Sequence, residues 1–421
     1  MKKIKNCCLA SRMLSQSNKS HVSSRKLGLE NLEERQLLSA STLAEAVAIA
    51  DLTSNAAVFA QQEEAFAPID LSNAVGDTIV VTSTASAGSG SLRAAILSAT
   101  GGETIVFDSS LAGATIMLDT ELNVQRNVTI DGGVGGDRVT VNANGNGAAF
   151  LISGSDVVLK DLVITGAVDK NGAVKYDNAN GFLTVTNCVF TENSNNSHNK
   201  GGGGALNINS AANVTVTDSV FDSNTASTYG AAIYAESSTT LTVDGCEFID
   251  NTASKDGGAI YTKSSSTTLS VTDSIFYDNH AMNGGSIYAA QATTLTIAGS
   301  EFENNSASVD GGAVYVSNYS SRVSVTDSIF YDNHANDGGA VYMASLSTVV
   351  FDNTQFTENS VSDNGGAIYG DGNDSPIDAP FTKNTAPNNG GAIYWGGNES
   401  PIDVPFTKNT AQNNGGAIYF D

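Results

Sequence analysis

Short stretches of alternating apolar and polar residues recur along this chain from about residue 182 onward. In the stretch "GGAIYTKSSSTTLSVTDSIFYDN", Leu269 and Val271 alternate with polar residues, which predicts a strand with one buried face. Ser274 and Phe276 also alternate, but on the opposite parity, so the chain must bend between Val271 and Ser274. We therefore predict two short strands joined by a corner, both with an inward face.

Two sequence elements return at a nearly constant spacing. Gly-Gly-Ala-Ile, or a close variant, recurs in steps of 27 residues and finally of 25, starting at Gly203, Gly230, Gly257, Gly284, Gly311, Gly338, Gly365, Gly390 and Gly415. Phe-x-x-Asn recurs in phase with it, at Phe190, Phe221, Phe248, Phe276, Phe302, Phe330, Phe356, Phe381 and Phe406. This periodicity predicts a solenoid. Helical repeats are excluded because the units are rich in Thr, Val, Ile and Gly and have no 3.6-residue apolar period.

The residue three positions before each of these phenylalanines is always Asn, Asp or Gly: Asn187, Asp218, Gly245, Asp273, Gly299, Asp327, Asn353, Asp378 and Asp403. These types tolerate left-handed backbone angles, so we predict a corner there. Phe-x-x-Asn is the next corner and "GGAIY" a third strand. The predicted fold is all-β, a right-handed single-stranded parallel β-helix with three strands per coil.

The stacking of coils also explains why "SVTDSIFYDNHA" occurs twice, at Ser270 and at Ser324. Coils stack at the strand spacing of about 4.8 Å, so identical residues on successive coils form ladders. The two copies of the string lie two coils apart. Cys188 and Cys246 fall in one inward ladder, two coils and roughly 9.5 Å apart. That separation is too large for a disulfide, and we predict two buried free thiols.

The N-terminal segment "LGLENLEERQLLSA" (residues 27–40) resembles the LEPR-XLL segment of large bacterial surface and secreted proteins. The resemblance implies that residues 1–40 are an export or sorting segment, and residues 41–75 read as a linker. In "GSGSLRAAILSAT", Ser91, Leu92, Arg93, Ala95 and Ile96 resemble the SLREA-type start of bacterial β-helix proteins. We expect a short capping helix over Ser91–Ala99, irregular coils across the rest of 76–181, and regular coils over 182–421.

The paired repeat elements of residues 182–421 resemble those of the chlamydial polymorphic outer-membrane proteins. The resemblance implies an autotransporter-like adhesin passenger at the cell surface, at the outer membrane or outside the cell. Those proteins are exported through a C-terminal β-barrel, and the resemblance of this chain implies their passenger-like part only. A fragment of a larger surface protein is a further interpretation. The last coil would expose apolar core and strand edges, so we also expect end-to-end self-association.

The net charge of the chain restricts the kinds of partner that it can bind. The net charge is −24, and the basic residues gather in the first 40 positions. So acidic a repeat region repels phosphate backbones, which argues against nucleic-acid binding. The sequence contains no apolar run of the roughly 20 residues that a transmembrane helix needs.

Parallel β-helices also host polysaccharide lyases and glycoside hydrolases, which is the alternative function. Asp273, Asp327, Asp378 and Asp403 are candidate carboxylates, but they occupy the corner position where Asn or Gly also serves. His280 and His334 follow the Asn of identical turns, and we expect them to point away from the inward Ser274 and Ser328. The "GDGND" stretch (residues 370–374) lacks the spacing of a calcium loop. We propose no catalytic, cofactor-binding or metal-binding residue from the sequence.

The predicted function is therefore contact: adhesion to a glycan or to a component of a host or neighbouring cell surface. In "GGAIY" the Ile and Tyr alternate, so if Ile faces the core, the tyrosines form one outward stripe. Its members are Tyr234, Tyr261, Tyr288, Tyr315, Tyr342, Tyr369, Tyr394 and Tyr419. Tyrosine suits contact surfaces because its ring is apolar and its hydroxyl polar.

Overall fold

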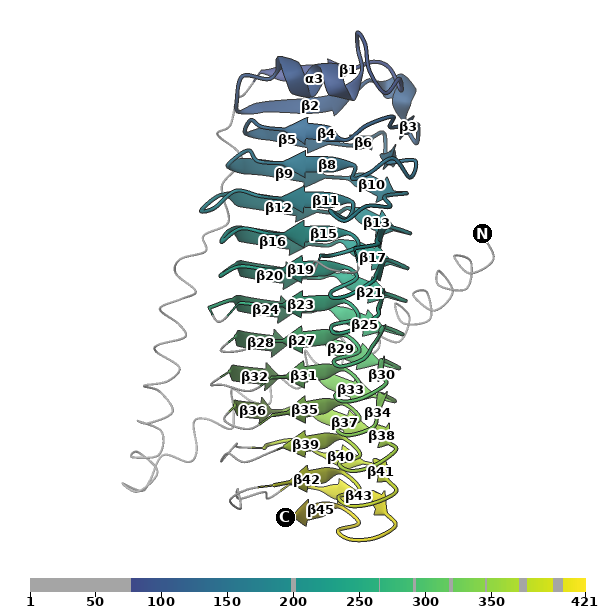
Figure 1. The fold of residues 1–421 in the computed structure, drawn as a ribbon, viewed down its shortest axis with the longest axis vertical. Coiled ribbons are helices and arrows are strands. Elements are labelled where there is room, and N and C mark those ends of the chain that lie inside the picture. Colours follow the sequence, from purple (N-terminus) through teal and green to yellow (C-terminus); the bar gives the residue numbers. More distant parts are fainter. Residues whose placement is uncertain are drawn as a thin grey trace, which may run out of the picture. The chain divides into compact units, whose positions relative to one another are not determined.

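The computed structural model describes residues 77–421 except 198–201, 265, 291–292, 318–320, 345–346, 371–376 and 397–403. The described part is an all-β, right-handed parallel β-solenoid of about 12 turns, which confirms the predicted fold (Figure 1). The predicted export segment and linker lie outside the described residues, as do Asp403 and most of "GDGND". Among the described helices, none is long and apolar enough to cross a membrane.

Successive coils pair in register and build four sheets, which we number in the order in which a coil visits them. The first sheet has 11 strands: β1 Thr78–Val81, β2 Glu103–Phe107, β5 Val128–Asp131, β9 Asp156–Lys160, β12 Phe182–Thr186, β16 Asn213–Thr217, β20 Thr240–Asp244, β24 Thr268–Thr272, β28 Thr294–Ala298, β32 Arg322–Thr326 and β36 Thr348–Asp352. The second has 13: β3 Thr115–Met117, β7 Asp137–Asn142, β10 Leu162–Thr165, β13 Val189–Thr191, β17 Val220–Asp222, β21 Glu247–Ile249, β25 Ile275–Tyr277, β29 Glu301–Glu303, β33 Ile329–Tyr331, β37 Gln355–Thr357, β40 Phe381–Thr382 and β43 Phe406–Thr407, with β6 Gly133–Val134 antiparallel to β7.

The other two sheets complete each coil. The third has nine two-residue strands: β14 Ser194–Asn195, β18 Thr225–Ala226, β22 Thr252–Ala253, β26 His280–Ala281, β30 Ser306–Ala307, β34 His334–Ala335, β38 Ser360–Val361, β41 Thr385–Ala386 and β44 Thr410–Ala411. The fourth has 12: β4 Leu122–Val124, β8 Phe150–Ile152, β11 Val174–Tyr176, β15 Leu206–Ile208, β19 Ile233–Ala235, β23 Ile260–Thr262, β27 Ile287–Ala289, β31 Val314–Val316, β35 Val341–Met343, β39 Ile368–Gly370, β42 Ile393–Trp395 and β45 Ile418–Phe420.

The regular coils thus have four strands, and the prediction of three was wrong. The residues after each Asn of Phe-x-x-Asn form a separate short strand, in which a small residue such as Ala226, Ala253 or Ala307 is buried. "GGAIY" is also not a strand throughout, because pairing begins at the Ile. The first glycine is left-handed, as at Gly311 (φ 67°). A Cβ on the second, Gly312, would lie 2.0 Å from the Gly339 carbonyl oxygen, so the two glycines make a corner that only glycine fits.

The predicted left-handed corner before each Phe is confirmed at seven of its nine positions, from Asn187 (φ 51°) to Asn353 (φ 47°). Asp378 is the exception among the described positions, since it does not have a positive φ. A second left-handed residue comes two positions after each Phe, and its side chain is Glu, Ser, Asp, Asn or Lys. Composition gave no sign of it, because Glu and Lys rarely adopt this conformation.

The interior of the solenoid is filled by ladders of identical residues. The nine repeat phenylalanines stack face to face, with centroids 4.6–5.1 Å apart. The asparagines of Phe-x-x-Asn form a second ladder, in which each amide bonds the next amide and a carbonyl of the coil before; Asn305 Nδ2, for example, donates to Phe276 O (2.9 Å) and to Asn333 Oδ1 (3.0 Å). Cys188 and Cys246 are buried and free, as predicted, and burial raises the pKa of each thiol to about 12.

The first coil is covered by the helix α3 (Leu92–Ser98), which lies over β4 at one end of the solenoid (Figure 1). Ser91 is its N-cap and accepts a hydrogen bond from the Ala94 N–H, and Ala99 is its C-cap, so the predicted capping helix is confirmed. Leu92, Ala95 and Ile96 are buried against the core. A short 3-10 helix, Ser109–Leu111, follows β2.

Candidate functional site

The predicted tyrosine stripe lies on the fourth sheet, at the middle position of each Ile-Tyr strand. Ile260 and its equivalents are buried in every coil but the last, where Ile418 is partly buried. The tyrosines therefore point to the opposite side of the strand, as the alternation predicts. Tyr234 is an exception in exposure, because only 1% of it is accessible. The others are half-buried: Tyr261, Tyr288, Tyr315, Tyr342, Tyr369, Tyr394 and Tyr419.

These eight residues, which we call the tyrosine ladder, stack on one another. Consecutive ring centroids lie 4.6–5.6 Å apart. Most planes are within 7° of parallel, as for Tyr288 and Tyr315 (4.8 Å, 7°). The ring faces are therefore covered by the neighbouring rings. They do not form an exposed flat surface. A partner would contact ring edges and hydroxyl groups, repeated once per coil.

A second ladder runs beside the tyrosines and was missed in the sequence. It consists of the residue before each glycine pair from Gly257 onward, which is Asp256, Asn283, Asp310, Asp337, Asn364, Asn389 or Asn414. We call it the aspartate column. Its amides and carboxylates bond from coil to coil: Asn283 Nδ2 donates to Asp256 Oδ1 (2.7 Å), and the Asn364 N–H donates to Asp337 Oδ1 (2.8 Å). The signal that could have revealed it is the recurrence of Asp or Asn before the glycine pair in every repeat from Gly257 onward.

The aspartate column places negative charge next to the tyrosine hydroxyls. Asp310 and Asp337 lie on adjacent coils, joined by a parallel bridge. Burial, with the Asp337 charge beside it, raises the pKa of Asp310 to about 6. Burial also raises the pKa of Tyr315 to about 12, and the Asp310 charge adds to this shift. At neutral pH, this face therefore presents neutral phenols flanked by carboxylates.

The residues considered for a catalytic triad do not converge. Ser274 and Ser328 are buried and donate to the carbonyls of Thr272 (2.7 Å) and Thr326 (2.7 Å), as an inward ladder requires. His280 and His334 lie on the third sheet with side chains 42% and 43% exposed. The predicted divergence of Ser and His is confirmed. Asp273 and Asp327 form left-handed corners, as expected of turn residues.

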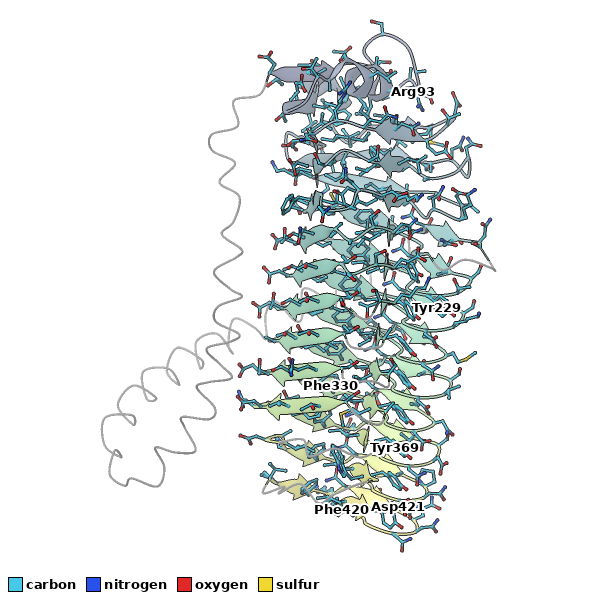
Figure 2. The ribbon with its side chains drawn as sticks, turned by 60° about the vertical axis from the view of Figure 1, so that its left-hand side comes forward. Arg93, Tyr229, Phe330, Tyr369, Phe420 and Asp421 are labelled. Atoms are coloured by element: carbon cyan, nitrogen blue, oxygen red, sulfur yellow. The ribbon has the colours of Figure 1, made fainter. Side chains whose placement is uncertain are left out.

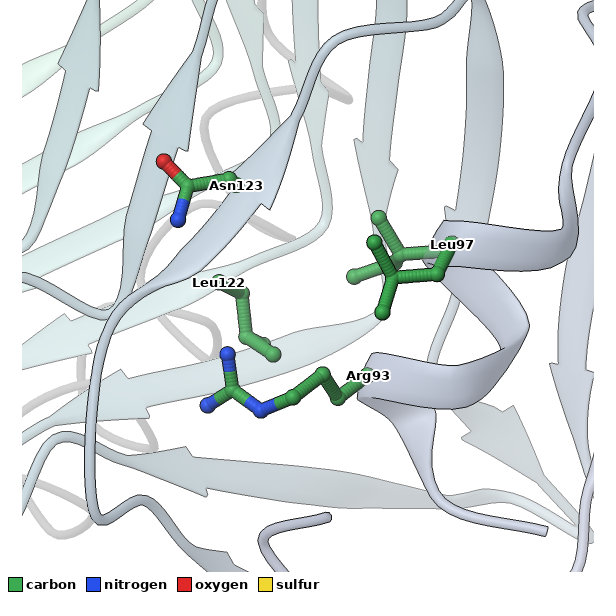
Figure 3. A pocket seen from close by; sticks show the side chains of 5 residues that line it. Arg93, Leu97, Leu122 and Asn123 are labelled. Atoms are coloured by element: carbon green, nitrogen blue, oxygen red, sulfur yellow. The ribbon is translucent and has the colours of Figure 1, made fainter. Parts of the chain in front are cut away.

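A small pocket beside the capping helix is lined by Arg93, Ile96, Leu97, Leu122 and Asn123 (Figure 3). Its only lining cation, Arg93, is engaged by the backbone: Nε donates to Ser86 O (3.0 Å), and the two Nη atoms donate to Glu121 O (2.8 Å) and Thr120 O (2.6 Å). These bonds tie the helix to the coil below. With a volume of about 70 Å³, the pocket is too small to hold a segment of a glycan chain.

Comparisons with known proteins agree with this architecture. The family described as "Right handed beta helix region" matches the chain over residues 109–281, 204–386 and 258–421. No curated protein matches the sequence. Among solved structures, a mannuronic acid specific polysaccharide family 6 lyase from human gut microbiota is similar, with 11% identity, 78% of this chain and 83% of that chain covered, and a TM-score of 0.31. Likeness at this level carries no argument about activity.

Proposed function

Because the chain belongs to the right-handed β-helix family, we propose that it is an exported contact protein whose tyrosine ladder binds a glycan on a host or neighbouring cell. The observation that carries the proposal is the in-register row of half-buried tyrosines, which repeats one polar and aromatic edge along successive coils. A repeated surface suits a repeated ligand, since each coil can add one equivalent contact.

The charges beside the tyrosine ladder favour a neutral glycan over an acidic one. Asp256, Asp310 and Asp337 flank the ring edges, and the whole chain carries a net charge of −24. An anionic polysaccharide would approach against this field, whereas a neutral sugar can accept hydrogen bonds from tyrosine hydroxyls and donate them to the carboxylates.

Export to the cell surface, to the outer membrane or out of the cell is part of the same proposal. It is supported by the resemblance of residues 27–40 to LEPR-XLL segments and of residues 182–421 to chlamydial outer-membrane repeats. Adhesion is the role that fits both the location and the long repeated surface. A larger surface protein that contains this chain as one part would use the face in the same way.

We expect Tyr288→Phe combined with Tyr315→Phe to weaken binding to a neutral-glycan array by about tenfold, because two hydroxyl hydrogen bonds are lost at about 0.5–1.5 kcal/mol each. Phenylalanine keeps the stacked rings, so the unfolding midpoint should stay near that of the wild type. Alanine is less suitable because it would also remove two stacked rings.

The matched control is Tyr277→Phe with Tyr331→Phe, two exposed tyrosines of the second sheet, on another face of the solenoid. This pair should leave binding unchanged. Equal binding by the wild type and the Tyr288/Tyr315 variant would show that the ladder is not the contact surface. Wild-type preference for acidic glycans would contradict the electrostatic argument.

A lyase or hydrolase remains the second candidate, favoured by one observation: the paired Asp310 and Asp337, with the pKa of Asp310 raised to about 6. Neighbouring carboxyls, at least one of them with a raised pKa, are a feature of sites that cleave a glycosidic bond by acid–base catalysis. Incubation with pectin, alginate and chondroitin, read for unsaturated products and new reducing ends, distinguishes the two functions. Products that disappear in Asp310→Asn would favour the enzyme; we expect none from the wild type.

A second copy of the chain is a further proposed partner. Phe420 lies in the last coil (Figure 2), and it is 37% exposed. Phe406 and Ile418 of the same coil are only partly buried, whereas Phe381 and Ile393 of the coil before are fully buried. In the purified chain, association through this coil would cover these apolar side chains. Sedimentation of the purified chain should show concentration-dependent association, reduced by Phe420→Asp. A monomer at all concentrations would contradict it.

A further inference from the structure

A cluster of metal-ligating side chains lies where the second sheet turns into the third, apart from the tyrosine ladder. Asp250, Asp278 and His280 each offer one ligand atom, and these atoms lie within 4.8 Å of one another. Asp250 and Asp278 are the left-handed residues of successive coils (φ 56° and 57°), and His280 begins β26 in the same coil as Asp278. All three are half-buried, so they are oriented by the fold and still reached by solvent.

The imidazole of His280 is held by a partner outside the cluster. Its Nδ1 lies 2.6 Å from the hydroxyl oxygen of Ser306 on the next coil, and its Nε2 lies 3.4 Å from Asp278 Oδ1. One ring nitrogen therefore has a hydrogen-bond partner and the other faces the carboxylates. This is the usual arrangement of a metal-binding histidine, whose second nitrogen is fixed by an outer group.

The charges along this column supply a second argument. In later coils the same position pairs opposite charges, with Lys383 Nζ 2.5 Å from Glu358 Oε1. On the coil after Asp278, the same position holds an amide in place of a carboxylate. Asn304 Nδ2 donates a hydrogen bond to Asp278 Oδ1 (3.1 Å). Asp250 and Asp278 place two carboxylates on adjacent coils, and His280 Nε2 lies beside that of Asp278. Like charges so close repel, and a bound cation would convert the repulsion into attraction.

We propose that Asp250, Asp278 and His280 bind a divalent first-row transition-metal ion, such as Zn²⁺ or Mn²⁺, with water completing its coordination. One imidazole and two carboxylates are the ligand types that such ions accept together. Ca²⁺ and Mg²⁺ prefer oxygen ligands alone and would gain little from His280.

The duplicated string provides a natural comparison within the same chain. In its second copy His334 keeps both contacts, with Nδ1 2.7 Å from Ser360 Oγ and Nε2 3.4 Å from Asp332 Oδ1. The two histidines share these contacts, but the neighbouring coils differ on both sides. Asn304 replaces Asp250 on the coil before, and Glu358, which is paired with Lys383, replaces Asn304 on the coil after.

This difference can be measured by NMR on the full chain with ¹³C-labelled histidine, because the sequence contains only four histidines. Mn²⁺ is titrated in, and paramagnetic broadening of each ring signal is followed; His280→Gln and His334→Gln assign the two signals. We expect the His280 signal to broaden at a Mn²⁺ concentration at least about tenfold lower than the His334 signal, since loss of one supporting ligand typically costs 10–100-fold in affinity.

Two reciprocal variants test the assignment. Asp250→Asn should make His280 respond like His334, and Asn304→Asp should make His334 respond like His280. Both replacements suit a left-handed position, and thermal unfolding confirms that each variant remains folded. Simultaneous broadening of all histidine signals in the wild type would indicate non-specific attraction to an acidic protein and overturn the proposal. So would an Asp250→Asn variant that behaves like the wild type, or the absence of any broadening.

Discussion

Phe302→Ala is expected to destabilise the solenoid by about 3–5 kcal/mol, the usual cost of removing a fully buried aromatic ring. Phe302 is completely buried and stacks on Phe276 and Phe330, with both centroid distances 4.7 Å. Its removal opens a cavity that the rigidly paired strands on either side cannot close. Chemical denaturation, followed by circular dichroism, measures the loss, and limited proteolysis should reveal new cleavage near β29.

The matched control is Phe182→Ala, the same chemical change at a residue that is 46% exposed. It should alter the free energy of unfolding by no more than about 0.5 kcal/mol, as is usual for surface positions. If Phe302→Ala and Phe182→Ala behave alike, Phe302 does not lie in the core and the register of the second sheet is wrong.

Asn305→Ala should be comparably damaging, although it removes no apolar group. Asn305 Oδ1 accepts from the N–H and the Nδ2 of Asn279, each at 3.0 Å, and Asn305 Nδ2 donates to Phe276 O (2.9 Å). All these groups are buried, and each buried polar group left without a partner costs about 1–3 kcal/mol. We expect a loss of at least about 3 kcal/mol in the free energy of unfolding.

Asn123→Ala is the control for this prediction, because Asn123 is an exposed residue of β4. Its replacement should be nearly neutral. A small effect at both positions would mean that water reaches the asparagine ladder and takes over its hydrogen bonds. Asn305→Asp adds a further check, because a carboxylate cannot donate to Phe276 O and would place a charge among buried groups, so it should also destabilise.

The interior ladders and the surface ladders have different consequences for function. Inside, Phe302 and Asn305 repeat because identical residues pack and bond best one coil apart. On the surface, side chains at the same repeat position also lie one coil apart, whatever their type. In the two proposals, the tyrosines form the contact surface, and two aspartates with a histidine form the cation site. The proposed binding and metal functions therefore use the coil spacing that stabilises the fold.

Much of this protein follows from the sequence alone. The spacing of Phe-x-x-Asn and of the glycine pairs determined the solenoid, and the alternation around Leu269 and Ile260 determined which side chains face inward. Asn187 and Asp273 marked a corner because few residue types accept a left-handed backbone. The resemblance of the stretch from Ser91 to Ile96 to SLREA-type starts implied the capping helix. These features depend on local conformation and on burial, both of which leave a pattern within one repeat.

Other features were decided only by the tertiary structure. The fourth strand at His280–Ala281 exists because the coil before and the coil after pair with it, and a two-residue strand has no pattern of its own. The left-handed position of Asp278 and Lys383 has no compositional signal, since Glu, Ser and Lys occupy it as well as Asp and Asn. The Asn that follows each of them is buried and bonded to a neighbouring coil. The tyrosine rings stack face to face, and Asp250 lies close to His280, because the stacking of coils brings together residues about 30 positions apart. Those contacts depend on the register between coils, which no single repeat encodes.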